Sequence, residues 1–303
     1  MLITEVTELE IEMSTLCNAK CPLCYRNYKS FPEEYKKPVI RKFEDLCNQL
    51  NEYTNLNYVM IVGSMSEPTL YPYFLDVVAY LKKRNIRIEI CTNGSTHSTE
   101  FWKELGKLLS TEDAVYFTIC GSTQEIHEKY RVGTILQNIL DNAKALRTII
   151  PIDYAQCIRF SYNSNDFETE EFKNIINEFS NVYMTETFYP KNIENYNTKF
   201  DISLFIPNKL KIEKYNKVKT IAECYYSRNA GKLKAQCQSY NHKRQQIDVF
   251  GNVYPCYLFL EYSNLKKWNG DYSEILSIEH DCCKYCEKSV YEYCVKNKLD
   301  YII

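Results

Sequence analysis

The sequence lacks both a hydrophobic run long enough to cross a membrane and an N-terminal signal peptide. No apolar stretch approaches the roughly 20 residues that a membrane-spanning helix needs, and Met1–Glu5 has neither the basic nor the apolar region of a secretory signal. A charge excess is also missing, since 37 basic and 39 acidic residues leave a formal net charge of −2. The sequence therefore has no overall basic field of the kind that would indicate a nucleic-acid partner. These absences favour a cytoplasmic protein that binds neither membranes nor nucleic acid.

Glycine is scarce and tyrosine abundant, at 8 and 27 of 303 residues, which we interpret as a compositional bias rather than a functional signal. A chain of this length suits one large domain, or one domain with a small appendage. Its 14 cysteines gather towards the start and the end of the sequence. Because thiols stay reduced in the cytoplasm, these groups indicate metal binding rather than a disulfide framework.

The first cysteine group is a C-x3-C-x2-C motif formed by Cys17, Cys21 and Cys24. It follows Leu9–Ser14, whose alternating pattern predicts a strand, so its loop would leave the C-terminal end of that strand, where β/α folds place their chemistry. Three thiols can reach one metal centre, whereas a structural four-coordinate site takes four protein ligands. We therefore expect an open coordination position. A zinc site completed by a distant fourth ligand is the alternative.

This motif, on a loop after the first strand, resembles that of the radical S-adenosylmethionine (radical SAM) enzymes. The resemblance implies that Cys17, Cys21 and Cys24 hold a [4Fe-4S] cluster whose fourth iron binds the methionine moiety of SAM. It further implies that one electron, from a flavodoxin- or ferredoxin-type donor, cleaves SAM to a 5′-deoxyadenosyl radical. That radical removes hydrogen from an unactivated C–H bond. Oxygen damages an exposed cluster, so anaerobic or low-oxygen conditions are expected.

A second segment with this resemblance follows the apolar strand predicted at 58–62. The family usually has Gly-Gly-Glu-Pro at this point, and here Glu67 and Pro68 match while Met65 and Ser66 replace the two glycines. The resemblance implies that Gly63, Ser66 and Glu67 bind SAM, with Glu67 holding its amino group. The alternative for Glu67 is a solvated loop carboxylate.

Three more candidate SAM-binding residues lie at the ends of later strands. Asn93 stands in a Thr-Asn-Gly turn after the strand predicted at 86–90, and Thr118 ends the strand predicted at 113–120. In the family these positions face SAM. Arg159, in the strand predicted at 152–162, is either a ligand of the SAM carboxylate or an ordinary ion-pair partner.

A short His-x-x-x-Arg segment, His127 to Arg131, resembles one found in peptide-modifying maturases. The likeness covers few residues. We therefore interpret His127 as a surface or supporting residue rather than a catalytic one.

Apolar residues at helical spacing alternate with the predicted strands over residues 1–190. Counting these units gives about six β/α repeats, and right-handed crossovers would roll their strands into an open sheet. The predicted fold class is α/β, a partial (β/α)6 TIM-like barrel, which is also the fold that the family resemblance implies. A polar stretch, 191–222, is predicted to bridge this core to a small C-terminal domain at 223–303.

The C-terminal domain carries the second cysteine group. A hairpin predicted at 246–255 would bring Cys237 and Cys256 side by side, and the C-x2-C pair Cys283 and Cys286 could complete one centre. On geometry alone a zinc ribbon is favoured. Behind a radical SAM core, however, the spacing resembles the SPASM and Twitch extensions, which implies an auxiliary [4Fe-4S] cluster. The remaining cysteines of this region have no assigned role: Cys224, Cys282 and Cys294.

The sequence is compatible with two classes of substrate. One is a small molecule such as a sugar or another metabolite, and the other is a ribosomal peptide, as for a peptide maturase or epimerase. No leader-binding domain is seen before Cys17, which slightly disfavours a peptide. A non-catalytic zinc- or iron-binding protein is the alternative of another class.

Overall fold

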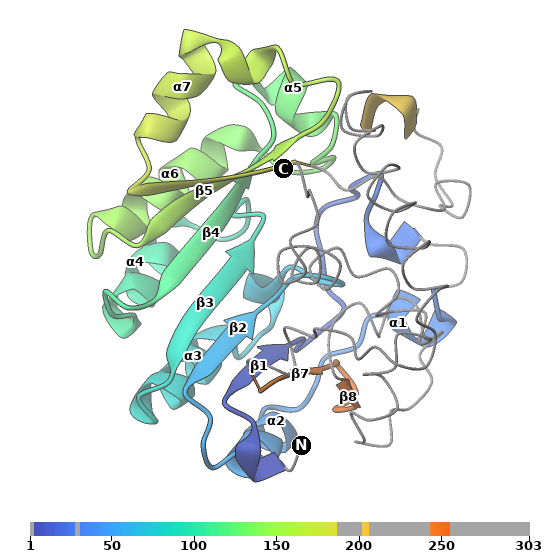
Figure 1. Ribbon diagram of the computed structural model, residues 1–303, viewed down its shortest axis with the longest axis vertical. Coiled ribbons are helices and arrows are strands. Elements are labelled where there is room, and N and C mark those ends of the chain that lie inside the picture. The colour runs from blue at the N-terminus through green and yellow to red at the C-terminus, as the bar shows by residue number, and fades with distance from the viewer. Residues whose placement is uncertain (1–2, 28–30, 187–201, 206–242, 255–303) are drawn as a thin grey trace, which may run out of the picture.

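The computed structural model describes residues 3–27, 31–186, 202–205 and 243–254, and its strands form one open eight-stranded sheet (Figure 1). The strand order is β6-β5-β4-β3-β2-β1-β7-β8. Every neighbouring pair from β6 to β7 is parallel, and β7 and β8 are antiparallel. The strands are β1 (Glu8–Ile11), β2 (Tyr58–Ile61), β3 (Arg87–Thr92), β4 (Ala114–Ile119), β5 (Asp153–Arg159), β6 (Asn181–Glu186), β7 (Arg244–Ile247) and β8 (Val253–Tyr254).

Helices follow the strands and cover one face of the sheet, where α3, α4 and α6 lie together (Figure 1). They form because apolar side chains recur on one side of each helix, as Phe74, Val77 and Leu81 do in α3. The helices of the described residues are α1 (Glu33–Lys36), α2 (Phe43–Asn51), α3 (Phe74–Lys83), α4 (Thr99–Leu108), α5 (Gln124–Glu128), α6 (Leu136–Arg147) and α7 (Glu170–Asn177). None of these is long and apolar enough to cross a bilayer.

The two faces of the sheet differ in chemistry because successive strand residues point to opposite sides. The helix-covered face is apolar, with Ile90, Val115 and Phe117 buried in the main core. The opposite face carries polar and aromatic side chains in register, and Tyr116 of β4 lies beside Tyr154 of β5 with ring centroids 4.8 Å apart. We call this second surface the inner face.

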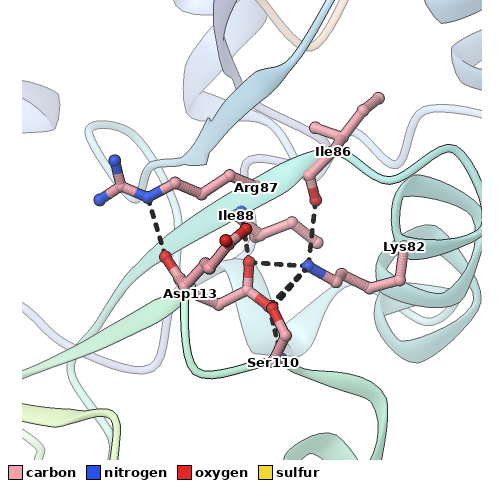
Figure 2. Close-up of polar contacts among 7 residues, drawn as sticks. Lys82, Ile86, Arg87, Ile88, Ser110 and Asp113 are labelled. Atoms are coloured by element: carbon pink, nitrogen blue, oxygen red, sulfur yellow. Dashed lines mark hydrogen bonds and ion pairs between the residues drawn. The ribbon is translucent and has the colours of Figure 1, made fainter.

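A largely buried ion pair joins the elements at the end of the sheet where β3 and β4 begin (Figure 2). The Asp113 carboxylate pairs with the Lys82 ammonium, with Nζ and Oδ2 2.7 Å apart. It also accepts hydrogen bonds from the backbone N–H groups of Ile88 and Ser110, each at 2.7 Å. Lys82 itself donates to the Ile86 carbonyl at 3.2 Å. The Asp113 carboxylate therefore joins α3 to both strands, at the end of the sheet opposite the cysteine loop.

The predicted open partial barrel is confirmed: the parallel strands β1 to β6 alternate with helices, and the sheet does not close. Two short elements were not predicted, α1 in the polar stretch before Pro38 and α5 before Arg131. The helix α2 begins at Phe43, after Ile40, which pairs with Ser14 in an isolated bridge.

The expected hairpin is present, with Gly251 at a φ of +82° in its turn. Its first strand, β7, also pairs in parallel with β1, from Glu8↔Arg244 to Ile11↔Ile247. The hairpin therefore extends the core sheet at its β1 edge. The predicted boundaries near 190 and 222 fall outside the described residues.

Candidate active site

The cysteine loop, residues 12–24, leaves the C-terminal end of β1. Within it the Cys24 N–H donates to the Cys21 carbonyl at 3.0 Å, which makes a tight turn, and the Asn27 amide donates to the same carbonyl at 2.9 Å. Cys21 is buried, Cys17 and Cys24 are partly exposed, and all three are free thiols. The loop thus presents three unpaired thiols at the C-terminal ends of the strands.

Three contacts bind this loop to segments that follow other strands. They place the motifs that the sequence predicted in direct contact with the cysteine loop. The contacts are Glu67 N–H to Leu16 O (2.7 Å), Asn93 Nδ2 to Asn18 Oδ1 (2.8 Å) and Lys20 N–H to Val132 O (2.8 Å).

Glu67 is buried between the ends of β2 and β3. Its Oε1 accepts the hydroxyls of Thr69 and Thr92, at 2.7 and 2.5 Å, and its Oε2 accepts the Asn93 N–H at 2.7 Å. Burial raises the pKa of Glu67 although these hydrogen bonds oppose the rise. It is not a solvated loop carboxylate. Because Oε1 is already occupied by protein donors, Oε2 is the oxygen with acceptor capacity left for a ligand.

Glu12 is a second buried carboxylate of the site, and the sequence reasoning missed it. It accepts the Met65 N–H at 3.0 Å and the Ser66 hydroxyl at 2.8 Å. Burial raises its pKa from 4.5 to about 8. Gly63 is needed in the same loop, because a Cβ there would lie 2.4 Å from the Ser66 carbonyl oxygen. Gly63 and Ser66 therefore shape the loop that Glu12 holds.

Two of the later candidates join the site on the inner face. Asn93 follows β3, and its side chain reaches the cysteine loop while its Oδ1 accepts the Ser95 N–H at 3.0 Å. Thr118 of β4 donates to the Thr92 carbonyl at 3.3 Å and lies 3.3 Å from the Gln156 amide oxygen. A polar row therefore runs from the cysteine loop across the ends of β3, β4 and β5.

Arg159 lies away from this row. Within β5 the side chains alternate, so Gln156 faces Thr118 while Arg159 belongs to the opposite set. Its guanidinium donates to Glu168 at 3.0 Å. The structure therefore shows the ion pair that the sequence left open as the alternative for Arg159.

His127 is a buried supporting residue rather than a surface one. Its Nδ1 accepts the Cys120 N–H at 3.2 Å, so the ring proton is on Nε2, which donates to the Thr134 hydroxyl at 2.9 Å. Burial lowers the pKa of His127 to about 3, which keeps the ring neutral. The Thr134 hydroxyl in turn donates to the Arg131 carbonyl at 2.7 Å. The His-x-x-x-Arg segment thus fixes the backbone at Arg131.

Arg131 reaches the cysteine loop through its side chain. Its Nη1 lies 3.6 Å from the Cys21 sulfur, and its buried Nε has no hydrogen-bond partner among the described residues. Burial opposes protonation, but the neighbouring sulfur atoms of Cys21 and Cys120 outweigh it, and the pKa of Arg131 is raised. A charged guanidinium therefore lies against one thiol of the motif.

The thiols of the loop fit an iron–sulfur cluster. Burial raises the pKa of Cys24 to about 12 and also raises that of Cys17, so their thiolates would need a nearby positive charge, which iron supplies. Within the described ranges, no three His, Cys, Asp or Glu side chains converge on a site for one metal ion. A cluster binds its thiolates on separate iron atoms and does not require that convergence. The second cysteine group, Cys237, Cys256, Cys283 and Cys286, lies outside the described residues.

Comparison with known proteins identifies the segment that carries this site. A protein-family model described as "Radical SAM superfamily" matches residues 11–179. A curated relative, the tungsten-containing aldehyde ferredoxin oxidoreductase cofactor-modifying protein of Pyrococcus furiosus, is 30% identical over 111 residues. That alignment covers 37% of this chain and 30% of the relative, so the chain matches less than a third of that protein's length.

Solved structures share the fold at low sequence identity. Streptococcus suis SuiB bound to S-adenosylmethionine matches with a TM-score of 0.61 and 14% identity, over 95% of this chain and 72% of SuiB. The structure of anSMEcpe with bound AdoMet matches with a TM-score of 0.59 and 17% identity, over 98% and 96% of the two chains. The same two neighbours were also solved with peptides, SuiB with the precursor peptide SuiA and anSMEcpe with AdoMet and the Cp18Cys peptide.

Proposed function

This chain belongs to the radical SAM superfamily, and from that premise we propose that it cleaves SAM reductively and removes hydrogen from an unactivated C–H bond. Membership implies an enzyme with a [4Fe-4S] cluster and SAM. The observation that carries the proposal is the position of Cys17, Cys21 and Cys24, on a loop bound to the ends of β2 and β3 through Glu67 and Asn93. A site in that place would bring a cluster and its cofactor together.

We assign the residues of the site as follows. Cys17, Cys21 and Cys24 hold the cluster, which together with SAM supplies the electron and the radical chemistry when bound. Glu67 accepts the amino group of SAM through Oε2, because its other oxygen is occupied. The loop and strand ends that orient SAM are provided by Gly63, Ser66, Asn93 and Thr118. Arg159 is not assigned a role, since it is paired with Glu168.

A peptide is the substrate class that we favour. Two neighbours of the same fold are described with bound peptides, and both match nearly the whole of this chain. A small-molecule substrate is the second candidate, supported by the relative that is described as cofactor-modifying. Adding candidate peptides or metabolites to the reduced enzyme separates the two, since the true substrate should increase formation of 5′-deoxyadenosine and lose one hydrogen.

The C-terminal cysteines are proposed to hold an auxiliary [4Fe-4S] cluster of the SPASM/Twitch type, with Cys237, Cys256, Cys283 and Cys286 as ligands. Their spacing and the hairpin that ends at β8 support this. A flavodoxin- or ferredoxin-type protein is the proposed electron donor.

The test is anaerobic reconstitution of the full chain and of Cys21→Ala. We expect about eight iron atoms per chain in the wild type and about four in Cys21→Ala, since each cluster holds four. Formation of 5′-deoxyadenosine should be lost in Cys21→Ala and kept in Cys47→Ala, a matched change of a partly exposed cysteine on α2. Zinc in place of iron, or SAM cleavage by Cys21→Ala, would refute the proposal.

A further inference from the structure

Arg131 has a guanidinium with a buried Nε, and the group that it contacts is a sulfur rather than a carboxylate. The partly buried cations Lys82 and Arg147 pair with Asp113 and Asp153. Buried Arg41 donates to neutral acceptors, the Gln49 side chain and the Asp45 carbonyl. Arg131 instead donates from Nη1 to the Cys21 sulfur at 3.6 Å, and none of the described ion pairs includes it. A buried cation is costly without compensation. A sulfur that carries negative charge in the loaded site provides it.

The geometry of this contact is fixed from both sides. The Arg131 N–H donates to the His127 carbonyl at 3.0 Å, and its own carbonyl accepts the Thr134 hydroxyl. The guanidinium lies over the Tyr130 ring at 5.4 Å. From the other side, the Lys20 N–H of the cysteine loop donates to the Val132 carbonyl at 2.8 Å. Gly133 has a φ of +85°, and a Cβ there would make a tight contact with that loop, 3.0 Å from the Asn18 carbonyl oxygen.

From this contact we infer that Arg131 raises the reduction potential of the cluster bound through Cys21. A [4Fe-4S] cluster in its 2+ state with three thiolates carries a net charge of −1, and one electron from the donor makes it −2. A fixed cation that also donates a hydrogen bond to a ligand sulfur stabilises the more negative state. Arg131 thereby makes the first electron transfer, on which SAM cleavage depends, more favourable. This inference rests on the proposed function, because it needs the cluster at Cys21.

The test measures the potential directly and not the activity. The reconstituted full-length protein is titrated with dithionite under argon, and the reduced cluster is followed by electron paramagnetic resonance. The signal that persists in Cys21→Ala identifies the auxiliary cluster and is subtracted. Arg131→Met removes the charge and the hydrogen bond, and Arg131→Gln removes the charge while keeping a donor. Lys129→Met is the matched control, because it removes one exposed cation two residues away.

We expect the reduction equilibrium to be at least about tenfold less favourable in Arg131→Met, which is a fall of about 59 mV for one electron. Arg131→Gln should fall in the same direction by less, and Lys129→Met should titrate like the wild type. Wild-type potentials in both Arg131 variants, with full iron content, would overturn the inference. Loss of the fold or of iron loading in them would also overturn it, since Arg131 would then be structural.

The two proposals fail in different ways. Unchanged iron content in Cys21→Ala would show that Cys21 holds no cluster, and the proposed function would then be refuted. A cluster that is lost in Cys21→Ala but titrates normally in the Arg131 variants would refute only the role of Arg131.

Discussion

Among single residues, Glu12 is a carboxylate of the site whose ionisation folding disfavours. Burial raises its pKa from 4.5 to about 8, while its bonds to Met65 and Ser66 act in the opposite direction. Between these values the folded state holds a proton that the unfolded state has released. Stability therefore falls as pH rises through this window, by about 1.4 kcal/mol per pH unit. Below pH 4.5 both states are protonated, so the penalty is absent there.

Glu12→Gln is predicted to remove this pH dependence. Glutamine keeps an acceptor for one of the two donors but cannot ionise. In urea denaturation of the metal-free protein, the loss of stability from pH 6 to pH 8 should be smaller than in the wild type by roughly 2 kcal/mol. Glu104→Gln, at an exposed position on α4, should leave the loss unchanged. An identical loss in Glu12→Gln and wild type would mean that Glu12 ionises normally when folded.

The sequence could identify the residues whose chemistry is visible in a motif, and it could not identify those that act through packing. The cysteine spacing and the Glu-Pro pair predict which loops meet, and the contacts of Glu67 and Asn93 agree with that. Glu12 gave a weaker signal, as one carboxylate within the strand predicted at Leu9–Ser14. Its bond to the Met65 N–H joins residues 53 positions apart, so only the folded arrangement of two loops reveals it.

At the level of helices and strands, most of the fold follows from local periodicity. Alternation predicted β1, and apolar residues at helical spacing predicted helices between the strands, because those patterns reflect which face each element buries. The parallel pairing of β7 with β1 was not predictable in this way, since it joins residues such as Glu8 and Arg244 that are far apart in sequence. The short helix α5 was missed because five residues carry too little periodic pattern.

The pair of Lys82 and Asp113 is predicted to stabilise the joint between α3, β3 and β4. Asp113→Ala would leave a largely buried ammonium and two backbone N–H groups without their acceptor. The free energy of unfolding should fall by about 3 kcal/mol or more. Glu104→Gln, which breaks the exposed pair with Lys107, should cost less than about 1 kcal/mol.

Urea denaturation of the metal-free protein measures both changes. The pair is at the end of the sheet opposite the cysteine loop, so iron content after reconstitution should stay at the wild-type value in Asp113→Ala. Equal stabilities for the two variants would show that the buried pair contributes no more than an exposed one.

For the whole molecule, the hairpin of β7 and β8 decides whether the C-terminal segment is independent of the core. Asp248, in the hairpin turn, accepts the hydroxyls of Tyr35 and Tyr254 and the N–H groups of Phe250 and Asn252. Ile247 lies in the main hydrophobic core. These contacts unite α1, the hairpin and the sheet, so we expect the described part of the predicted C-terminal domain to unfold together with β1.

Asp248→Ala is therefore predicted to destabilise the entire core. Several buried donors would lose their acceptor at once, which should cost about 3 kcal/mol or more. In a Trp268→Phe background, fluorescence reports on Trp102, which is buried on α4. Its ring packs against Phe117 of β4, a strand that β3, β2 and β1 separate from β7. The urea midpoints by this fluorescence and by far-UV circular dichroism should fall together. Asp141→Ala, at an exposed carboxylate on α6, should shift neither. A separate early transition with an unchanged Trp102 midpoint would instead show a hairpin that unfolds on its own, as the predicted division at 223–303 requires.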